Sequence, residues 1–152
     1  MSTRYILSID PGLATGLSFF SIESGEDPVL LFSWEADFAE TQKIVRGLYE
    51  KYPTVETVCE RFTITVATAK KSQAPFSLEV IGMVKGLMLD AGYDPQRLAL
   101  QMPSDAKNIF PNPKLKKLGY WHVGEGGHAN DSIRHGLLYL VKTGWKPVGL
   151  LE

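Results

Sequence analysis

YILSIDPGLATG, residues 5–16, is the stretch that decides the fold class of this chain. Its first half is apolar enough to predict a buried central strand. Pro11 cannot extend a strand ladder and Gly12 permits a tight reversal, so the strand is expected to end at Asp10. A second apolar run, residues 17–22, follows at once. The two runs together predict a β-hairpin.

Asp10 is therefore expected where a core strand meets solvent. An ionised carboxylate beside apolar neighbours is costly unless a positive group pairs with it. A metal ion is one such group, and a nearby lysine or arginine is the other. This stretch alone leaves two readings open, a metal or phosphate site and a structural aspartate.

The composition is that of an ordinary globular protein. The 152 residues are 44% hydrophobic and 22% charged, which predicts one domain over residues 1–152. We find no run long enough to span a bilayer and no signal-peptide pattern. The single cysteine, Cys59, precludes an internal disulfide, so we expect a cytoplasmic protein in which Cys59 is a buried small side chain. The net charge of −1 does not indicate a nucleic-acid binder, and local charge must decide that point.

The remaining apolar runs predict an α/β fold. Strands are expected at residues 5–10, 17–22, 29–34, 57–62 and 97–101, and helices at residues 38–52, 104–110 and 128–142 and from Phe76 to Ala91. Asp37 is the expected N-cap of the first helix, with Glu40 as its partner, and Ser104 that of the third. Residues 63–66 alternate and would prolong the fourth strand, with a loop as the second reading. This order predicts a five-stranded mixed sheet with helices on both faces. Nothing places the tail from Trp145 to Glu152.

The helix from Phe76 to Ala91 is apolar nearly all round. Gly82 and Gly86 lie one turn apart among large apolar residues. Such a helix must be buried on more than one face. Composition leaves a central core helix and a subunit interface equally open.

Three carboxylates stand at the ends of predicted elements. Asp10 and Glu60 close two strands that can lie side by side, and Asp131 is in the first turn of the last helix. At about 100° per residue, Asp131 shares one face with His128 and His135, opposite the apolar stripe. If the acids converge without a cation, at least one pKa is raised. Such an oxygen-rich set suits Mg²⁺ or Mn²⁺, and two ions about 4 Å apart can serve phosphodiester hydrolysis. Three unrelated surface acids are the alternative.

These motifs resemble the RuvC family of Holliday junction resolvases. They are Ile9-Asp10-Pro11-Gly12 with Thr15-Gly16, Glu60 on the fourth strand, and His128-Ala129-Asn130-Asp131. The resemblance covers nearly the whole chain by element order, and it implies a ribonuclease-H-like fold and a Mg²⁺-dependent endonuclease acting on Holliday junctions or other branched DNA. Asp10, Glu60, Asp131 and His128 would be the metal ligands, with the choice between His128 and His135 open. Short members occur in bacteriophages, and the chain length points to that origin.

The resemblance also implies a homodimer through the helix Phe76–Ala91 and a catalytic lysine, best matched by Lys107. The further DNA contacts that we expect are Arg61, Phe62, Lys70, Lys71, Lys114, Lys116 and Lys117. One position departs from the family pattern. Relatives have an aromatic residue three positions after the catalytic glutamate, where it wedges against bases. Here Thr63 stands at that position and Phe62 precedes it, which puts strict junction preference in doubt.

Other functions compete with this interpretation. The same nuclease chemistry would serve on 5′ flaps, replication forks or RNA–DNA hybrids. A catalytically silent nucleic-acid-binding domain is disfavoured because all the acids are retained. In the actin-like ATPases and sugar kinases the phosphate loop reads Asp-x-Gly-x-x-x-Gly, which Asp10, Gly12 and Gly16 match. Those proteins need two such domains, and this chain has the length of one. The basic run between residues 107 and 122 is also compatible with a merely solvated face.

Overall fold

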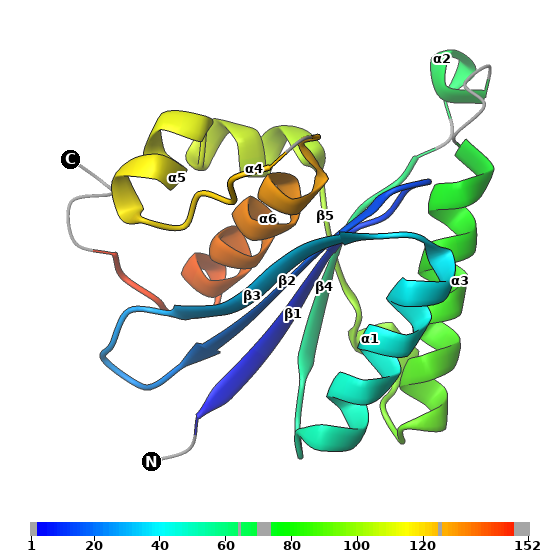
Figure 1. Ribbon diagram of the computed structural model, residues 1–152, viewed down its shortest axis with the longest axis horizontal. Helices are drawn as coiled ribbons and strands as arrows, with labels where there is room; N and C mark the ends of the chain where they lie inside the picture. Colours follow the sequence, from blue (N-terminus) through cyan, green and yellow to red (C-terminus); the bar gives the residue numbers. More distant parts are fainter. Residues whose placement is uncertain (1–2, 64, 70–73, 125, 148–152) are drawn as a thin grey trace.

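A five-stranded mixed sheet with helices on both faces forms the framework of the chain in this computed structural model, as predicted (Figure 1). The strand order is β3-β2-β1-β4-β5. The strands are β1 Arg4–Asp10, β2 Thr15–Ile22, β3 Val29–Ala36, β4 Glu56–Glu60 and β5 Ala99–Gln101. The β1–β2 and β2–β3 pairs are antiparallel, whereas β1–β4 and β4–β5 are parallel. The structure describes residues 3–63, 65–69, 74–124 and 126–147.

Two layers of helices enclose the sheet. Helices α1 (Phe38–Lys51) and α3 (Ala74–Asp90) cover one face, and α4 (Pro103–Ile109), α5 (Asn112–Leu118) and α6 (His128–Lys142) cover the other (Figure 1). Two short elements, α2 (Val66–Ala69) and the 3₁₀ turn η1 (Pro95–Arg97), complete the described helices. Within the described residues, none of these helices combines the length and the apolar character that a membrane crossing requires.

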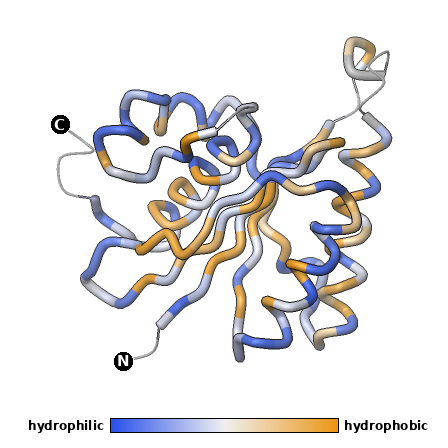
Figure 2. The backbone as a smooth tube through the Cα atoms, viewed as in Figure 1, coloured by the Kyte–Doolittle hydropathy of each residue, from blue (hydrophilic) through white to orange (hydrophobic). Residues whose placement is uncertain are grey.

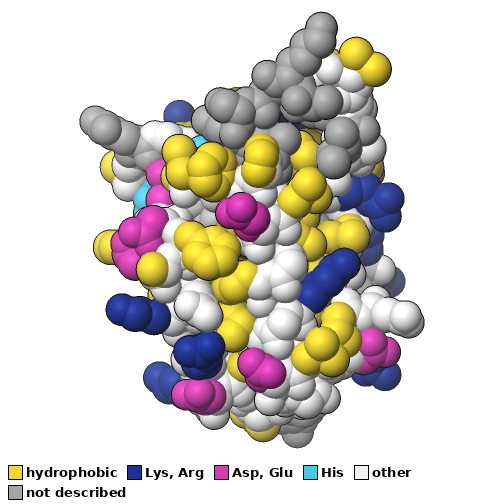
Figure 3. Space-filling model, turned by 90° about the vertical axis from the view of Figure 1, so that its right-hand side faces the viewer, with side chains coloured by type: hydrophobic (Ala, Val, Ile, Leu, Met, Phe, Trp, Pro, Cys, Tyr) yellow, Lys and Arg dark blue, Asp and Glu magenta, His cyan; other side chains and the backbone are white. Residues whose placement is uncertain are grey.

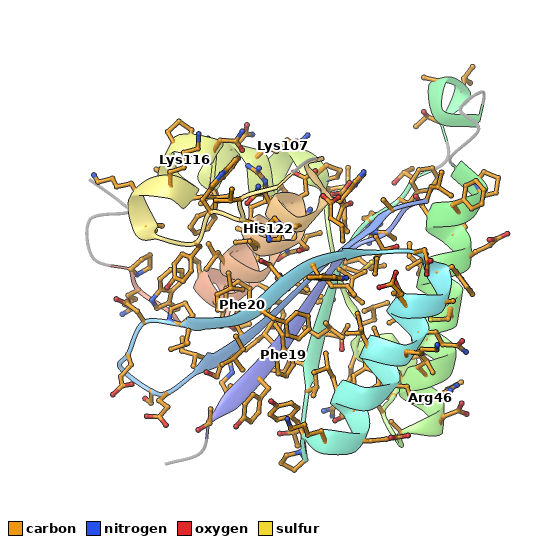
Figure 4. All side chains as sticks on the ribbon, in the orientation of Figure 1. Phe19, Phe20, Arg46, Lys107, Lys116 and His122 are labelled. Atoms are coloured by element: carbon orange, nitrogen blue, oxygen red, sulfur yellow. The ribbon has the colours of Figure 1, made fainter. Side chains whose placement is uncertain are left out.

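Alternating side chains along the strands supply two separate cores. Phe19 and Phe20 are neighbours on β2 but point to opposite faces of the sheet (Figure 4). Phe19 packs with α1 and α3, and Phe20 packs with α4, α5 and α6. The hydrophobic colouring follows the central strands and the helix sides next to them (Figure 2). The alternation of side chains along each strand therefore decides which residues pack against the helices on each face of the sheet.

The structure corrects two strand boundaries expected from the sequence. The fourth strand ends at Glu60 and is not prolonged through residues 61–63, Ile64 lies outside the described residues, and Val66 begins α2. The fifth strand begins at Ala99, because Asp94 caps a 3₁₀ turn in front of it. The first strand ends at Asp10 as predicted.

The helix boundaries also differ in two places. Asp37 caps α1 as expected, accepting a hydrogen bond from Glu40 N at 2.8 Å. Ser104 is not a cap, since α4 begins one residue earlier with Met102 at its N-cap. Helix α5 was not predicted, although Gly119 ends it in the left-handed conformation that favours glycine (φ 84°).

Helix α6 lies at the centre of its layer. The sequence placed Asp131, His128 and His135 on the face of α6 opposite its apolar stripe, and His135 on that face is buried against Glu60 of β4 and Gln101 of β5. Helices α4 and α5 cover the side of α6 away from the sheet (Figure 1). His135 is only 1% exposed, and Asp131 is the one residue between 129 and 138 that is not buried. The site helix is thus a core element whose polar residues are enclosed by protein.

The first turn of α6 rests directly on β2. A Cβ atom at Gly16 would overlap the carbonyl group of His128, so only glycine allows this approach. Glu35 of β3 accepts hydrogen bonds from His128 N at 3.0 Å and Ala129 N at 3.2 Å. This carboxylate satisfies two N–H groups that a helix start leaves unpaired, and its charge complements the helix dipole.

The far end of α6 is tied down as well. Arg4 forms a bidentate ion pair with Glu56, and Tyr139 donates to the same carboxylate at 2.8 Å. Trp145, which the sequence did not place, is buried against Phe110, and its indole donates to Asp27 at 3.0 Å. The tail from residue 148 lies outside the described residues.

We expect Gly16→Ala to destabilise the protein by about 1–3 kcal/mol, because an added methyl group must displace helix backbone. Gly47→Ala is the matched control, since Gly47 lies in α1 with open space around its Cβ position. It should stabilise the protein by up to about 1 kcal/mol through helix propensity. Urea unfolding of both variants measures the difference. Equal stabilities would contradict the packing described for α6.

Candidate active site

Three carboxylates lie near one edge of the sheet. Asp10 and Glu60 are the last residues of β1 and β4, which are neighbouring parallel strands. Both side chains follow the strand positions that face α6, and α6 begins beside them with Asp131 in its first turn. The pKa of Asp10 is raised from 3.8 to about 6. Burial is the main cause, and the negative charges of Glu60 and Asp131 contribute to the same shift. The negative charges of Glu60 and Asp131 therefore act on Asp10.

Each carboxylate has its own positive or hydrogen-donating partner, and all three partners belong to α6. The pairs are His128 Nδ1 with Asp10 Oδ2 at 3.0 Å, His135 Nε2 with Glu60 Oε2 at 3.0 Å, and Arg134 Nε with Asp131 Oδ1 at 3.1 Å. The hydrogen bond to Asp10 is the main reason that the pKa of His128 is raised. One helix thus supplies both a carboxylate and the groups that compensate every carboxylate of the site.

The carboxylates are paired with α6 and not gathered around one point. In the described part of the chain, no three histidine, cysteine, aspartate or glutamate side chains lie close enough together to hold a metal ion. The donor set nevertheless fits a hard divalent cation, because it is rich in carboxylate oxygens. The buried Asp10 carboxylate, with its raised pKa, is also a group that an added positive charge would stabilise. Metal binding would require these side chains to exchange their present partners.

Both candidate histidines lie at the site in different positions. His128 contacts Asp10 and is half-exposed, whereas His135 is buried behind Glu60. His128 is therefore the one of the two that solvent and ligands can reach.

A cavity of about 620 Å³ adjoins Asp131. Lys107 of α4, Trp121 and Arg134 line it. Arg134 is 6% exposed and donates to the carbonyl oxygen of Phe110 at 2.7 Å and to Asn112 Oδ1 at 2.6 Å. This arginine fastens α4 and α5, and with them Lys107, to the helix that carries Asp131.

The predicted DNA-contact residues fall into three groups. Lys107 and Lys116 lie on the α4–α5 side of the molecule (Figure 4), where Lys116 and Lys117 are exposed and Lys114 is half-buried. Lys116 Nζ lies 4.6 Å from the centroid of the Trp121 ring. Arg61 and Phe62 directly follow Glu60, with Arg61 exposed. Lys70 and Lys71 lie outside the described residues.

Sequence reasoning missed Glu35, Gln101 and Arg134. Glu35 contacts α6 from 93 residues away, and no local pattern signals such a cap. Gln101 ends β5 beside Glu60, so its place at a strand end was the available signal. Arg134 follows Asp131 by three residues, a spacing that brings side chains together on a helix.

No protein-family model matches the sequence, and no curated protein is detectably similar to it. Similar folds occur among solved structures. The structure of Thermus thermophilus RuvC superposes with a TM-score of 0.70, and that of T. thermophilus RuvC in complex with a Holliday junction substrate with 0.67. Each is 14% identical to this chain, and each match covers 93% of this chain and 97% of the other. The chain therefore has the ribonuclease-H-like fold seen in RuvC, which confirms the predicted fold. The expected bacteriophage origin stays a prediction.

We expect Asp10→Asn to stabilise the metal-free protein at pH 7. Because the pKa of folded Asp10 is raised from 3.8 to about 6, wild-type stability falls as the pH rises through this window. A pKa shift of this size corresponds to a loss of at most about 3 kcal/mol in folding stability at pH 7. The variant has no ionisable side chain at this position and does not incur this loss. The gain should shrink toward zero near pH 4.

Chemical unfolding in the presence of a chelator, repeated across this pH range, measures the effect. Glu26→Gln, which removes an exposed carboxylate from a turn, is the control and should stay within about 0.5 kcal/mol of wild type. If Asp10→Asn is less stable than wild type at pH 7, the pairing with His128 fully compensates the charge of Asp10, and the prediction is wrong.

Proposed function

We propose that the chain is a RuvC-family nuclease, with residues 1–152 as one domain, which cleaves Holliday junctions or other branched DNA with divalent metal ions. The observation that supports this proposal is the placement of Asp10, Glu60 and Asp131 near one edge of a RuvC-like sheet, where the charges of Glu60 and Asp131 act on Asp10. A neighbour with the same fold is described in complex with a Holliday junction substrate. The coincidence of fold and acids favours phosphodiester hydrolysis over the silent and ATPase alternatives.

The ligands would be Asp10, Glu60, Asp131 and His128, holding two Mg²⁺ or Mn²⁺ ions. Such ions, when bound, lower the pKa of a water molecule and stabilise a leaving oxygen. His128 holds a proton at Nδ1 against Asp10, which limits the repulsion among the acids in the free protein. Lys107 lines the same cavity as Asp131, and its ammonium group would compensate charge on the scissile phosphate.

The DNA path that we propose follows basic residues of α4 and α5 and the residues just after β4. Lys107, Lys114, Lys116 and Lys117 lie on α4 and α5, and Arg61 and Phe62 follow β4. Lys70 and Lys71 join this path on sequence grounds alone. Contacts to phosphates position DNA without reading bases, so selectivity would come from the shape of a branched duplex.

We propose a homodimer through α3. Four of its residues, Leu78, Gly82, Gly86 and Leu89, fall on one stripe at about 100° per residue. Leu78 and Leu89 are 42% and 62% exposed, and a Cβ atom on either glycine would meet open space. The opposite side of α3, with Val80, Val84 and Leu87, packs on the core. Figure 3 views the outer side of the layer formed by α1 and α3, where apolar side chains are spread between a few charged groups. The stripe offers a partner helix a close approach.

A flap, fork or hybrid nuclease on the same fold is the second candidate. Thr63 stands where the family pattern has its aromatic residue, and Phe62 is half-buried one position earlier. Without an aromatic side chain at this position to wedge against bases, a strict preference for four-way junctions is less expected.

We expect the wild-type protein with Mg²⁺ to cut a four-way junction faster than plain duplex. Asp10→Asn, Glu60→Gln and Asp131→Asn should each slow cleavage at least about 100-fold while DNA binding persists, because metal ions supply several kcal/mol to such reactions. Glu50→Gln on the exposed side of α1 is the control. Assays on junction, flap, fork, duplex and RNA–DNA hybrid measure both rate and preference. Cleavage of none of them by the wild type would overturn the proposal.

We expect Leu78→Glu to convert the proposed dimer into a monomer, because two buried carboxylates would face each other across the symmetry axis. Val29→Glu is the control, since Val29 is 56% exposed on β3, away from α3. Sedimentation at several protein concentrations measures the mass. A wild-type chain that stays monomeric at all of them would remove α3 as an interface.

A further inference from the structure

Two buried polar side chains, Gln101 and His135, stand behind Glu60 of the site. Gln101 ends β5 and is 4% exposed, and His135 on α6 is 1% exposed. Gln101 Nε2 lies 2.9 Å from the carbonyl oxygen of His135 and 3.1 Å from Nδ1 of the same residue. The other ring nitrogen, Nε2, lies 3.0 Å from Glu60 Oε2. The contacts run in one line from β5 through α6 to the end of β4.

The direction of each hydrogen bond follows from the carbonyl group. A backbone carbonyl only accepts, so the amide nitrogen of Gln101, and not its oxygen, must face His135. This nitrogen has a second hydrogen, which is directed at Nδ1 of the ring. A proton on Nδ1 would set two donors against each other. Nδ1 therefore accepts, the ring proton is on Nε2, and Nε2 donates to Glu60.

We propose that Gln101 is a positioning residue for Glu60. By fixing the tautomer of His135, it makes the imidazole a donor that restrains Glu60 Oε2 and so the orientation of this carboxylate. This inference rests on the proposed function for the role of Glu60 as a ligand. Ligating carboxylates are commonly oriented by such hydrogen bonds, and removing the orienting group typically costs about 10–100-fold in metal affinity or activity.

An unsatisfied atom supports a positioning role over simple filling of the core. Gln101 Oε1 is buried and has no hydrogen-bond partner in the described part of the chain. A buried oxygen of this kind costs about 1–3 kcal/mol, which a leucine at this position would avoid. The sheet register pairs Gln101 with Glu60, and both face α6. The glutamine thus lowers stability at a position from which it can orient His135. Such a cost is expected where function constrains the residue.

Nitrogen-15 NMR of the ring nitrogens tests the tautomer directly. The chain has three histidines, so two single substitutions, of His122 and His128, assign the signals. We expect the wild-type protein to show an unprotonated Nδ1 and a protonated Nε2 at His135. Gln101→Glu replaces the donor by an acceptor and should place a proton on Nδ1, whereas Gln101→Leu should release the tautomer. A protonated Nδ1 in the wild type overturns the proposal, and this spectrum decides even if both variants fail to fold.

The second readout is function at the acids. Gln101→Leu and Gln101→Glu should lower kcat for the best DNA substrate about 10–100-fold and weaken Mn²⁺ binding, with KM for DNA little changed because Gln101 is buried. Ser18→Ala is the matched control, since Ser18 also carries a buried oxygen without a partner but lies on β2. It should retain wild-type kcat.

The two hypotheses fail in different ways. If the wild type cleaves no substrate, the proposed function fails, while the NMR pattern and Mn²⁺ binding still decide the role of Gln101. If the wild type cleaves and folded Gln101 variants match it in kcat and in Mn²⁺ binding, the positioning role is overturned and the nuclease stands.

Discussion

The contact between the first turn of α6 and β2 is the constraint on which the site depends. The carbonyl group of His128 lies against Gly16, where no side chain separates helix from sheet. Glu35 fixes the same turn from the neighbouring strand through two N–H groups. Since Asp131, His128, Arg134 and His135 all belong to α6, the position of this one helix sets the geometry of every group around Asp10 and Glu60.

The same helix solves the electrostatic problem that the acids create. Three carboxylates at one sheet edge repel each other, and each receives a separate partner one or two turns along α6. The compensation is incomplete at Asp10, whose pKa stays raised to about 6. Residual strain of this kind is common at functional sites, where stability is given up for chemistry.

Much of the framework could be predicted, because strands with apolar runs and sharp ends leave a clear pattern. Asp10 followed by Pro11 and Gly12 marked one end, and Asp37 with Glu40 marked the start of α1. Helix α5 was not predicted, although Pro113 stands in its first turn, where proline is tolerated. The burial of His135 was not predicted either, because its contacts with Glu60 of β4 and Gln101 of β5 join segments far apart in the sequence. Contacts such as that of Glu35 with Ala129 join distant segments and leave no local trace.

Trp145 limits how far the chain can be truncated from its C-terminal side. Its ring closes the end of the core between the sheet and α4–α6, lying parallel to Phe110 with 6.4 Å between centroids. The indole nitrogen also holds the turn between β2 and β3 through Asp27. Trimming the chain at the end of α6 would open this core to water and remove the contact that holds that turn. The smallest version of this fold that keeps its second core therefore has to retain Trp145.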